Sequence, residues 1–250
     1  GFIGGQVVRA LIGAGHDVAV LHLPTDRLTN LEGLAVETIA GDVTDRACVR
    51  AALKGRDWVF HLAAIYALWT RDPERMRTVN VEGTRIVLQE AGDAGVQRVV
   101  YTSSIAVFGG QGLRRDATEE SPFRLGQTGD VYSLTKYESH RVAQSFAQDG
   151  LDVTIVAPTG PVGPGDVGPT PTGRLLLMAL NAPVGLAARS SSNVADVRDI
   201  AMGHVLAAEH GVRGESYLLG GENVDLATLP TLVYELAGIR HRPVVAVPSR

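Results

Sequence analysis

The sequence lacks the features that mark several large classes of protein. Its 250 residues include one cysteine, Cys48, which excludes an internal disulfide and a zinc site built from cysteines. There is no lysine- or arginine-rich run and the net charge is −4, so the basic stripe expected of a nucleic-acid-binding surface is missing. The apolar run Leu175–Leu180 is far shorter than the roughly 20 residues of a membrane span. The sequence therefore predicts no nucleic-acid partner, no membrane span and no metal site.

Aromatic residues are also few, which bears on the core, and no secretory leader pattern is seen, which bears on the location of the protein. Aromatic residues make up 5% of the chain, whereas 45% of residues are hydrophobic and 29 are glycine, which is enough apolar content for a substantial core. No basic, apolar leader of the secretory type is present, and we expect a reducing, cytoplasmic setting. Cys48 lies in an Ala/Val/Leu helical pattern and is interpreted as a small helical residue.

What the chain does have is an alternation of strands and helices. Helical patterns cover Pro73–Ala94, with Asp72 as N-cap and Pro73 in the first turn, and Val131–Gln148. Between such patterns lie apolar, strand-like runs at Val18–Leu23, Ala35–Ala40, Trp58–Ala63, Arg98–Thr102 and Val153–Ala157. This order predicts right-handed βαβ units and an α/β fold with a doubly wound, Rossmann-type parallel sheet.

The pattern changes after Pro158. Residues 158–173, PTGPVGPGDVGPTPTG, are rich in Gly, Pro and Thr and are predicted to be a long functional loop without regular structure. Beyond it we expect a serine-rich turn, a strand at Tyr217–Leu219, and helices at Arg174–Leu180, Val197–His210 and Leu226–Leu236. We predict a nucleotide-binding domain over residues 1–157, and a substrate-binding cap mixed with remaining Rossmann elements over residues 158–250.

The first residues, GFIGG, have the pattern of a phosphate-binding turn that enters a helix. Backbone N–H groups and the helix dipole can hold a pyrophosphate there. The full motif has three glycines, and Gly1 and Gly4 fit the second and third. We therefore expect that the first glycine and the preceding strand are missing, and that the natural protein starts roughly ten residues earlier, a length typical of a strand and its turn.

A second motif lies downstream. Ser104 follows the strand-like run Arg98–Thr102, and YSLTK at 132–136 places Tyr132 and Lys136 four residues apart on one helical face. A nearby ammonium favours the phenolate form of a tyrosine, which can then exchange a proton with an alcohol or ketone. A serine hydroxyl beside it can hold the carbonyl oxygen. A tyrosine and a lysine four residues apart also occur together by chance. The catalytic interpretation therefore depends on the position of this motif after a strand that ends in two serines.

The motifs together resemble the extended short-chain dehydrogenase/reductase family, over essentially the whole chain. They occur in the family's order: GFIGG (1–5), GDVTD (41–45), HLAA (61–64), NVEGT (80–84), YTSSIAVFG (101–109), YSLTK (132–136) and PTGPVGP (158–164). The resemblance implies Ser104, Tyr132 and Lys136 as the catalytic set, with Lys136 also bonding the nicotinamide ribose. It also implies that the family's sequence continues beyond Arg250.

The same resemblance implies a set of residues around an NAD(P) cofactor. These are Gly1, Phe2, Ile3, Gly4, Asp42, Val43, Leu62, Ala63, Ala64, Asn80, Thr102 and Pro158. Asn80 has an equally good alternative, a helix residue that bonds a neighbouring strand. For His61 we expect a hydrogen-bonded histidine at a strand end.

Substrate and cofactor preference are less directly signalled. Tyr66 and Trp69, after a strand end, and Thr159 are candidates to line the substrate pocket, although the two aromatic residues could equally pack the loop on the cap. Leu23 occupies the position where the related reductases carry an arginine for the 2′-phosphate of NADP. Arg27 follows closely and could reach that phosphate, or could be a solvated loop charge. NADP is therefore weakly preferred over NAD.

Three functions remain open from the sequence. The first is an NAD(P)-dependent oxidoreductase acting on a secondary alcohol or ketone of a small molecule. The resemblance is strongest to the dihydroflavonol-reductase and 3β-hydroxysteroid-dehydrogenase branch, which includes proteins named hopanoid-associated sugar epimerases. The second is a sugar-nucleotide epimerase, disfavoured because VAPTGPVGP replaces the epimerases' Arg-Tyr-Phe-Asn run. The third is a non-catalytic nucleotide sensor.

Dehydration is disfavoured because Ile105 and Ala106 replace an Asp-Glu pair. A homodimer through the 131–148 helix is possible.

Overall fold

The centre of the protein is a parallel sheet. The computed structural model describes residues 1–67, 69–109, 116–124, 130–188, 190–239 and 242–247. Four strands are hydrogen-bonded in the order β3 (Trp58–His61), β4 (Arg98–Thr102), β5 (Val153–Pro158) and β9 (Ser216–Leu219). All three pairings are parallel, with Tyr101 opposite His61 on one side and Ile155 on the other. The predicted parallel α/β sheet is confirmed.

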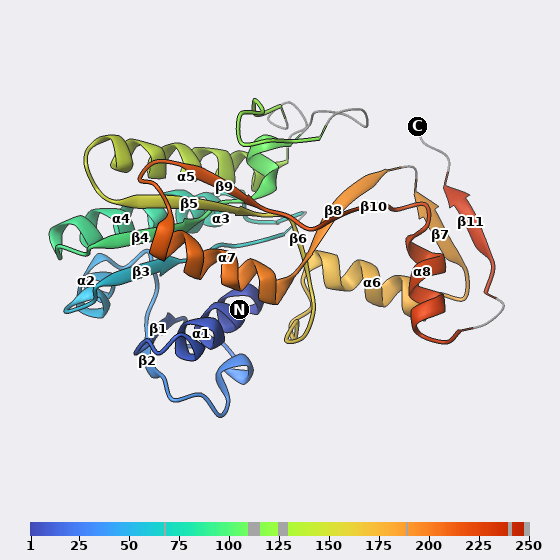
Figure 1. The fold of residues 1–250 in the computed structure, drawn as a ribbon, viewed down its shortest axis with the longest axis horizontal. Helices are drawn as coiled ribbons and strands as arrows, with labels where there is room; N and C mark the ends of the chain where they lie inside the picture. Colours follow the sequence, from blue (N-terminus) through green and yellow to red (C-terminus); the bar gives the residue numbers. More distant parts are fainter. Residues whose placement is uncertain (68, 110–115, 125–129, 189, 240–241, 248–250) are drawn as a thin grey trace.

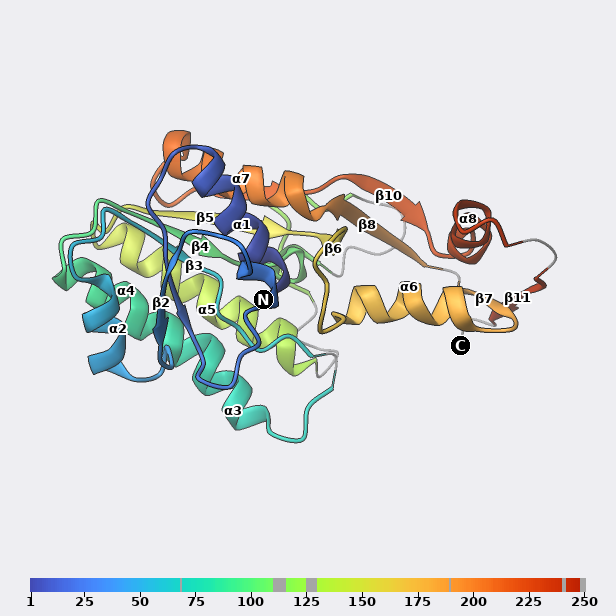
Figure 2. The ribbon, with the colours of Figure 1, turned by 90° about the horizontal axis from the view of Figure 1, so that it is seen from below.

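Helices cover both faces of this sheet (Figures 1 and 2). On one face, α4 (Gly83–Asp93) and α5 (Val131–Gln148) pack their apolar side chains against Val99, Tyr101 and Ile155. On the other, α7 (Val197–His210) packs against Val100 and Val156. Helix α1 (Phe2–Gly13) lies on α7. Neighbouring residues of β4 thus enter two separate cores, as the alternation of side chains along a strand requires.

A second, two-stranded parallel sheet lies beside α1. It consists of β1 (Ala19–His22) and β2 (Glu37–Ala40), joined through the 3₁₀ turn η1 (Thr29–Leu31). After β2, helix α2 (Arg46–Leu53) begins at Asp45, whose carboxylate accepts the N–H groups of Ala47 and Cys48. Cys48 is a helical residue of α2, as expected, and its thiol approaches the carbonyl of Ala40 at 3.8 Å.

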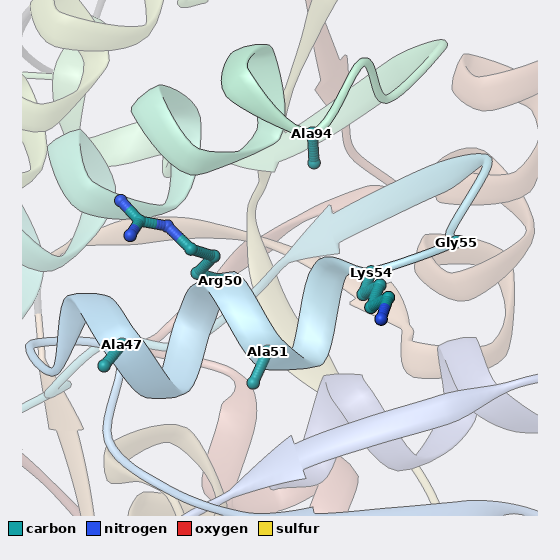
Figure 3. A pocket seen from close by; sticks show the side chains of 6 residues that line it. All are labelled: Ala47, Arg50, Ala51, Lys54, Gly55 and Ala94. Carbon is teal, nitrogen blue, oxygen red and sulfur yellow. The ribbon is translucent and has the colours of Figure 1, made fainter.

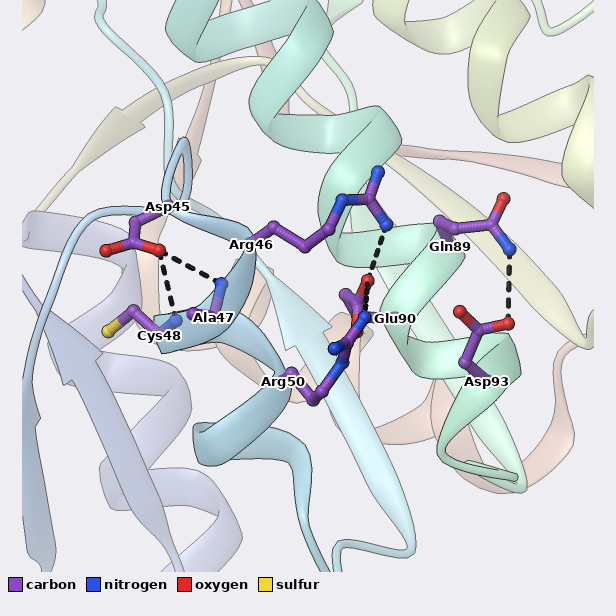
Figure 4. Close-up of polar contacts among 8 residues, drawn as sticks. All are labelled: Asp45, Arg46, Ala47, Cys48, Arg50, Gln89, Glu90 and Asp93. Atoms are coloured by element: carbon purple, nitrogen blue, oxygen red, sulfur yellow. Dashed lines mark hydrogen bonds and ion pairs between the residues drawn. The ribbon is translucent and has the colours of Figure 1, made fainter.

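An ion-pair cluster joins α2 to α4 (Figure 4). Glu90 on α4 is 1% exposed and accepts from Arg46 at 2.5 Å and from Arg50 at 2.7 Å. Hydrogen bonding from Arg50 and Arg46 lowers the pKa of this carboxyl group despite its desolvation. Glu90 therefore remains a carboxylate in the fold, paired with two arginines.

The helix predicted for Pro73–Ala94 forms, but it is not uniform. It consists of α3 (Pro73–Arg77), a π-helical segment η2 (Thr78–Glu82) and α4, in direct succession. Asp72 caps it by accepting the N–H of Arg75 at 2.8 Å. The π-helical segment carries Val79, Asn80 and Val81, all of which are buried. Segments of this kind are rare and occur often at functional sites.

The cap extends from the carboxyl ends of β5 and β9 (Figure 1). It contains the sheet β10 (Glu222–Asp225), β8 (Ser191–Asp196) and β6 (Gly160–Val162), and the parallel pair β7 (Gly185–Ala188) and β11 (Val244–Val247). Helices α6 (Pro171–Asn181) and α8 (Leu229–Leu236) pack beside these strands.

Two local predictions in the cap are wrong. Residues 158–173 contain β6 and the first turn of α6, because Gly160 pairs with Val194 and Pro171 fits the first turn of a helix. The serine-rich segment is the start of β8 rather than a turn, because Ser191 and Ser192 pair with β10. The helices at Val131–Gln148 and Val197–His210 are confirmed to the residue.

Candidate active site

Ser104 lies just past the carboxyl end of β4. The strand ends at Thr102, and Ser104 caps the short 3₁₀ helix η3 (Ile105–Phe108). Its Oγ accepts the N–H of Ala106 at 3.2 Å. Because that bond uses only a lone pair, the hydroxyl proton of Ser104 can still be donated. The residue is 8% exposed, at the edge where parallel strands of α/β sheets present ligand sites.

Tyr132 and Lys136 lie at the start of α5. Asp130 caps this helix and accepts the N–H of Tyr132 at 3.1 Å. Burial raises the pKa of the Tyr132 phenol above its usual value, and the charge of Lys136 and the nearby Ser104 hydroxyl oppose this change. The structure therefore brings the three predicted catalytic side chains together, with the phenol protonated.

The ammonium of Lys136 is held in a buried pocket. It donates to the carbonyl of Thr102 at 2.7 Å and to the hydroxyl of Tyr101 at 3.1 Å, and the residue is 3% exposed. Burial lowers the pKa of Lys136, and the neighbouring Tyr132 opposes that change. Tyr101 in turn donates to Ser139 at 2.6 Å. The interaction with Tyr101 was not foreseen, since sequence spacing does not show which strand residue faces α5.

Asn80 joins the loop after β3 to α5. Its Oδ1 accepts the N–H of Ile65 at 2.7 Å, and its Nδ2 donates to the carbonyl of Ile65 at 3.1 Å and to Thr135 Oγ1 at 3.0 Å. Thr135 donates to the carbonyl of Tyr132 at 2.9 Å. The alternative interpretation expected a bond to a neighbouring strand, whereas the partners of Asn80 lie in the loop after β3 and in α5.

Two buried histidines, His61 and His204, are hydrogen-bonded to other residues of the fold. His61, at the end of β3, contacts Thr84 Oγ1 at 2.9 Å, and burial lowers its pKa to about 3, so it is the hydrogen-bonded strand-end residue that was expected. His204 binds the carbonyl of Ile200 through Nδ1, so its Nε2 accepts the hydroxyl proton of Thr102 at 3.0 Å. Both the hydroxyl and the carbonyl of Thr102 are therefore engaged within the fold.

The start of α1 leaves open space. A Cβ added at Gly1 or at Gly4 would meet no atom within 4 Å. Phe2 is buried and Ile3 is partly buried. The glycine that close packing requires is Gly5, where a Cβ would lie 2.7 Å from Cβ of Asn30. Within the described residues, no side chain fills the space beside Gly4 in the first turn of α1.

The carboxyl end of β3 is also accessible. Leu62 is partly buried, whereas Ala63 and Ala64 are exposed. After β2, Val43 packs against α4 at Gly83, where a Cβ would approach the valine at 3.0 Å. The carboxylate of Asp42 accepts from Thr44 and from Arg75, the latter at 2.7 Å. Burial raises the pKa of Asp42, but these hydrogen bonds outweigh it and the pKa lies below its usual value.

Pro164 and Gly165 of the Gly/Pro segment are hydrogen-bonded to α1 and to η1. Gln6 donates to the carbonyl of Pro164 at 2.8 Å, and Asn30 donates to the carbonyl of Gly165 at 2.9 Å. Gly165 has φ +95°, and a Cβ there would lie 3.1 Å from both amide side chains. Sequence reasoning missed Gln6 and Asn30, because a lone amide in a helix or loop gives no signal of so distant a partner.

The residues that bear on NADP selection follow β1. The N–H of Leu23 donates to Asp26 at 3.1 Å, which turns that carboxylate back toward its own loop. Arg27 is exposed, and no hydrogen bond or ion pair within the described residues fixes its guanidinium.

The three candidate substrate residues differ in placement. The ring of Tyr66 lies against that of Tyr132, with centroids 4.7 Å apart. Trp69 is 73% exposed and Arg71 lies over its ring at 5.8 Å, and no ring contact among the described residues joins it to the catalytic set. Thr159 is buried, and its hydroxyl donates to the carbonyl of Leu219 at 3.3 Å. Pro158, beside it, is the buried last residue of β5.

A shallow hollow at the other end of the sheet contains no candidate residue. It is lined by Ala47, Arg50, Ala51, Lys54, Gly55 and Ala94 (Figure 3). Gly55 and Ala94 precede β3 and β4, so the hollow lies at the amino ends of the strands. Within the described ranges, no three His, Cys, Asp or Glu side chains form a metal-binding group. None of the helices described is both long and apolar enough to cross a membrane.

Comparison with known proteins identifies the family. The model of the NAD-dependent epimerase/dehydratase family matches residues 1–220. The chain belongs to this family. Its members and relatives are NAD-dependent dehydrogenases, reductases and epimerases, so the expected enzyme class and the Rossmann-type fold of the extended short-chain dehydrogenase/reductase group are confirmed.

Two sequence relatives and one solved structure illustrate the relationship. A Synechocystis sp. protein provisionally named dihydroflavonol 4-reductase is 37% identical over 245 residues, which cover 96% of this chain and 71% of that protein. Sterol demethylase protein B of Methylococcus capsulatus is 36% identical over 252 residues, covering 100% of this chain and 76% of the relative. A dTDP-glucose 4,6-dehydratase from Streptomyces venezuelae, solved with NAD bound, superposes with a TM-score of 0.87 at 26% identity, covering 100% of this chain and 82% of that one.

Proposed function

We propose that this protein interconverts a secondary alcohol and a ketone on a small organic substrate, with Tyr132 as the acid/base. The observation that carries the proposal is the convergence of Ser104, Tyr132 and Lys136 at the carboxyl end of β4. In reduction, the phenol of Tyr132 donates its proton to the carbonyl oxygen; in oxidation, the phenolate takes the proton of the alcohol. Ser104, whose O–H remains available as a donor, orients the same substrate oxygen.

The residues present fit an NAD(P) cofactor. When bound, the nicotinamide supplies or accepts the hydride. Gly1 and the N-terminus of α1 would hold the pyrophosphate, with Phe2, Ile3 and Gly4 in the same turn. Leu62, Ala63 and Ala64 would line the cofactor beside β3, while Asp42 and Val43 would face the adenine and Pro158 the nicotinamide. Among the described residues the ammonium of Lys136 has two acceptors, so its third N–H is available for the ribose.

Tyr132→Phe tests this assignment directly. We expect kcat to fall by at least about a hundredfold, the lower range for loss of a general acid/base, while the Kd of the cofactor is retained. Tyr137→Phe is the matched control, because Tyr137 is on the same helix and uses its ring to stack on Phe123 at 4.2 Å. Turnover of Tyr132→Phe near the parent rate would refute the role of Tyr132.

A preference for NADP over NAD is proposed from Arg27. Its exposed guanidinium follows the end of β1, where the 2′-phosphate of NADP would lie. Arg27→Ala is expected to weaken NADPH binding and leave NADH binding unchanged, as measured by fluorescence titration. Equal changes for both nucleotides would contradict this role.

A sugar-nucleotide epimerase is the second candidate, favoured by the likeness to a solved nucleoside-diphosphate-sugar epimerase from Pseudomonas aeruginosa, which superposes with a TM-score of 0.82 at 27% identity. The two candidates differ in how they hold cofactor, since an epimerase regenerates it in each cycle. The purified protein should be denatured and any released nucleotide identified by mass. Stoichiometric NAD would favour the epimerase; a protein that binds NADPH or NADH reversibly would favour the reductase.

Three further expectations accompany the proposal: a homodimer formed through α5, a cytoplasmic setting, and the division at residue 157. Exposed residues of α5 include Arg141 and Gln148, so a dimer contact there would be polar at these positions. Sedimentation equilibrium with and without Arg141→Glu would test the dimer, which should weaken if α5 forms the interface.

A further inference from the structure

Thr102, the last paired residue of β4, is hydrogen-bonded to the helices on both faces of the central sheet. Its carbonyl accepts the ammonium of Lys136, from α5, at 2.7 Å. Its hydroxyl lies 3.0 Å from Nε2 of His204, from α7. Because α5 and α7 cover opposite faces of the sheet, one strand residue connects the candidate catalytic lysine to a histidine on the far side (Figures 1 and 2).

The bond between Thr102 and His204 has a fixed direction. Nδ1 of His204 lies 2.7 Å from the carbonyl of Ile200, which can only accept, so Nδ1 carries the proton. The ring is fully buried, which lowers the pKa of His204 to about 4 and keeps it neutral at pH 7. Nε2 is therefore an acceptor, and Thr102 donates its hydroxyl proton to it.

The peptide between Thr102 and Ser103 carries the carbonyl that Lys136 binds. Its N–H donates to the carbonyl of Val156 at 2.7 Å, which holds the peptide within the plane of the sheet. The ladder with β3 has already ended at this point. A displacement out of that plane, toward α5 or α7, would stretch or compress the bond between Thr102 and His204. That bond therefore restrains the direction in which the carbonyl meets Lys136.

Helix α7 gives this bond a rigid support. His204 is 0% exposed, and the neighbouring Val205 is 2% exposed. A second hydrogen bond joins α7 to β4, because Arg98 donates to the carbonyl of Ala208 at 2.8 Å. The helix is thus fixed to both ends of β4, and its position is set by the core rather than by the candidate site.

We propose that His204 is a positioning residue that acts through Thr102 to hold the Lys136 ammonium in place beside Tyr132. The inference rests on the proposed function, since it concerns the charge that acts on the phenol of Tyr132. With the carbonyl of Thr102 held by α7, the ammonium stays where its charge favours the phenolate. Without that bond, the carbonyl and the ammonium can shift together, and the phenolate loses part of its stabilisation.

Two substitutions remove the bond, one from each side. Thr102→Val keeps the side-chain shape without the hydroxyl, and His204→Asn keeps an N–H for Ile200 but withdraws the acceptor. Each is expected to lower kcat/KM by about five- to tenfold, the effect of one hydrogen bond. The double variant should be no slower than either single variant, because both remove the same interaction. His204→Gln, whose amide oxygen can reach the position of Nε2, should recover most of the loss.

Two control variants separate positioning from stability. Thr154→Val matches Thr102→Val, because Thr154 is a buried threonine of the adjacent strand β5 whose hydroxyl has no hydrogen-bond partner among the described residues. Arg98→Gln loosens α7 from the opposite end of β4 and should lower the free energy of unfolding. Both controls are expected to retain the parent kcat/KM.

The absorbance of the Tyr132 phenolate gives a readout that needs neither turnover nor cofactor. The pKa of this phenol is the difference between titrations of each protein with and without Tyr132→Phe. The two bond-removing variants should raise this pKa by about half a pH unit, and the two controls should leave it unchanged. His61 and His140 also feel the charge of Lys136, but burial lowers their pKa to about 3 and about 4, far below the range of a phenol.

An unchanged pKa of Tyr132 in both variants, an equal rise in Arg98→Gln, or additive losses of kcat/KM would each overturn the positioning role. If Tyr132→Phe abolishes turnover, such a result removes the role of His204 alone. If Tyr132→Phe retains the parent rate, the proposed function falls, and the role of His204 falls with it.

Discussion

The ammonium of Lys136 makes two contacts with Tyr101, one with its hydroxyl and one with its ring. Its Nζ donates to the Tyr101 hydroxyl at 3.1 Å and lies 4.9 Å from the centroid of the same ring. Tyr101 comes from β4 and is 1% exposed, so its position is set by the core of the sheet. The cation of the candidate catalytic set is therefore aligned by a strand residue as well as by its own helix.

Tyr101→Phe should weaken this alignment while preserving the ring. Lys136 would keep the carbonyl of Thr102 but lose its second acceptor, and a hydrogen bond to a charged group contributes about 1.5–3 kcal/mol. We expect kcat/KM to fall by about tenfold. Ser139 still donates to the carbonyl of Thr135, so the fold should persist. An unchanged kcat/KM in a folded variant would show that Tyr101 does not align Lys136.

Asn80→Ala should destabilise the protein. The variant leaves the N–H of Ile65 without its acceptor and the carbonyl of Ile65 without its donor, and each unsatisfied buried group costs about 1–3 kcal/mol. The free energy of unfolding is measured by urea titration. Asn223→Ala is the control: that amide is exposed and its loss should change stability by less than about 0.5 kcal/mol. Equal effects of the two variants would contradict the structural role of Asn80.

The buried histidines predict a loss of stability in mild acid. Burial lowers the pKa of His61 to about 3, and that of His140 and His204 to about 4. Below about pH 6.5 the unfolded chain binds protons on these residues, while the native chain does not until the lowered values are reached. Their contribution is therefore fully present above pH 6.5 and is lost as the pH falls toward 4.

The expected slope is about 1.4 kcal/mol per pH unit for each such histidine. Urea titrations at pH 7, 5.5 and 4.5 would measure it. Replacement of His204 by Gln should reduce the slope. A free energy of unfolding that stays constant from pH 7 to 4.5 would rule out these lowered pKa values.

Glu90→Gln should lower stability at neutral pH, because Arg46 and Arg50 lose the carboxylate that they share. The pKa of Glu90 is lowered in the fold, so its contribution is present above about pH 4.5, the ordinary value, and is lost as the pH falls through the lowered one. The deficit of the variant should thus shrink in strong acid. Glu82→Gln is the control, since its pair with Arg85 is exposed. A similar loss in both variants would contradict the special role of Glu90.

Local signals accounted for much of the fold. Helix α5 was predicted to the residue because its cap at Asp130 and its periodicity are both contained in the segment. The four-residue spacing that places Tyr132 and Lys136 on one face of this helix is also contained in the segment. By contrast, β6 and β8 were missed because their apolar patterns are weak and their strand character comes from pairing with each other, as in Gly160 with Val194.

The parts of the site that escaped prediction depend on distant contacts. Asn30 bonds Gly165, and Tyr101 bonds Lys136, across separations that no periodicity encodes. The same is true of Tyr66: the sequence placed it near the substrate, but only the fold shows its ring on Tyr132. Residue types and spacing thus indicated the chemistry. The neighbours that position the side chains of the candidate site are set by tertiary packing, which the sequence does not show.

The π-helical segment at Thr78–Glu82 fixes the angular phase between two helices. A π turn holds one more residue than an α turn, so α3 and α4 are out of step by about one residue, or about 100° of rotation. The shift lets Met76 and Leu88 both lie at 0% exposure while Asn80 still points at Ile65 and Thr135. A chain shorter by one residue in this segment could form a regular helix. It would then lose either the burial of both Met76 and Leu88 or the hydrogen bonds of Asn80 to Ile65 and Thr135.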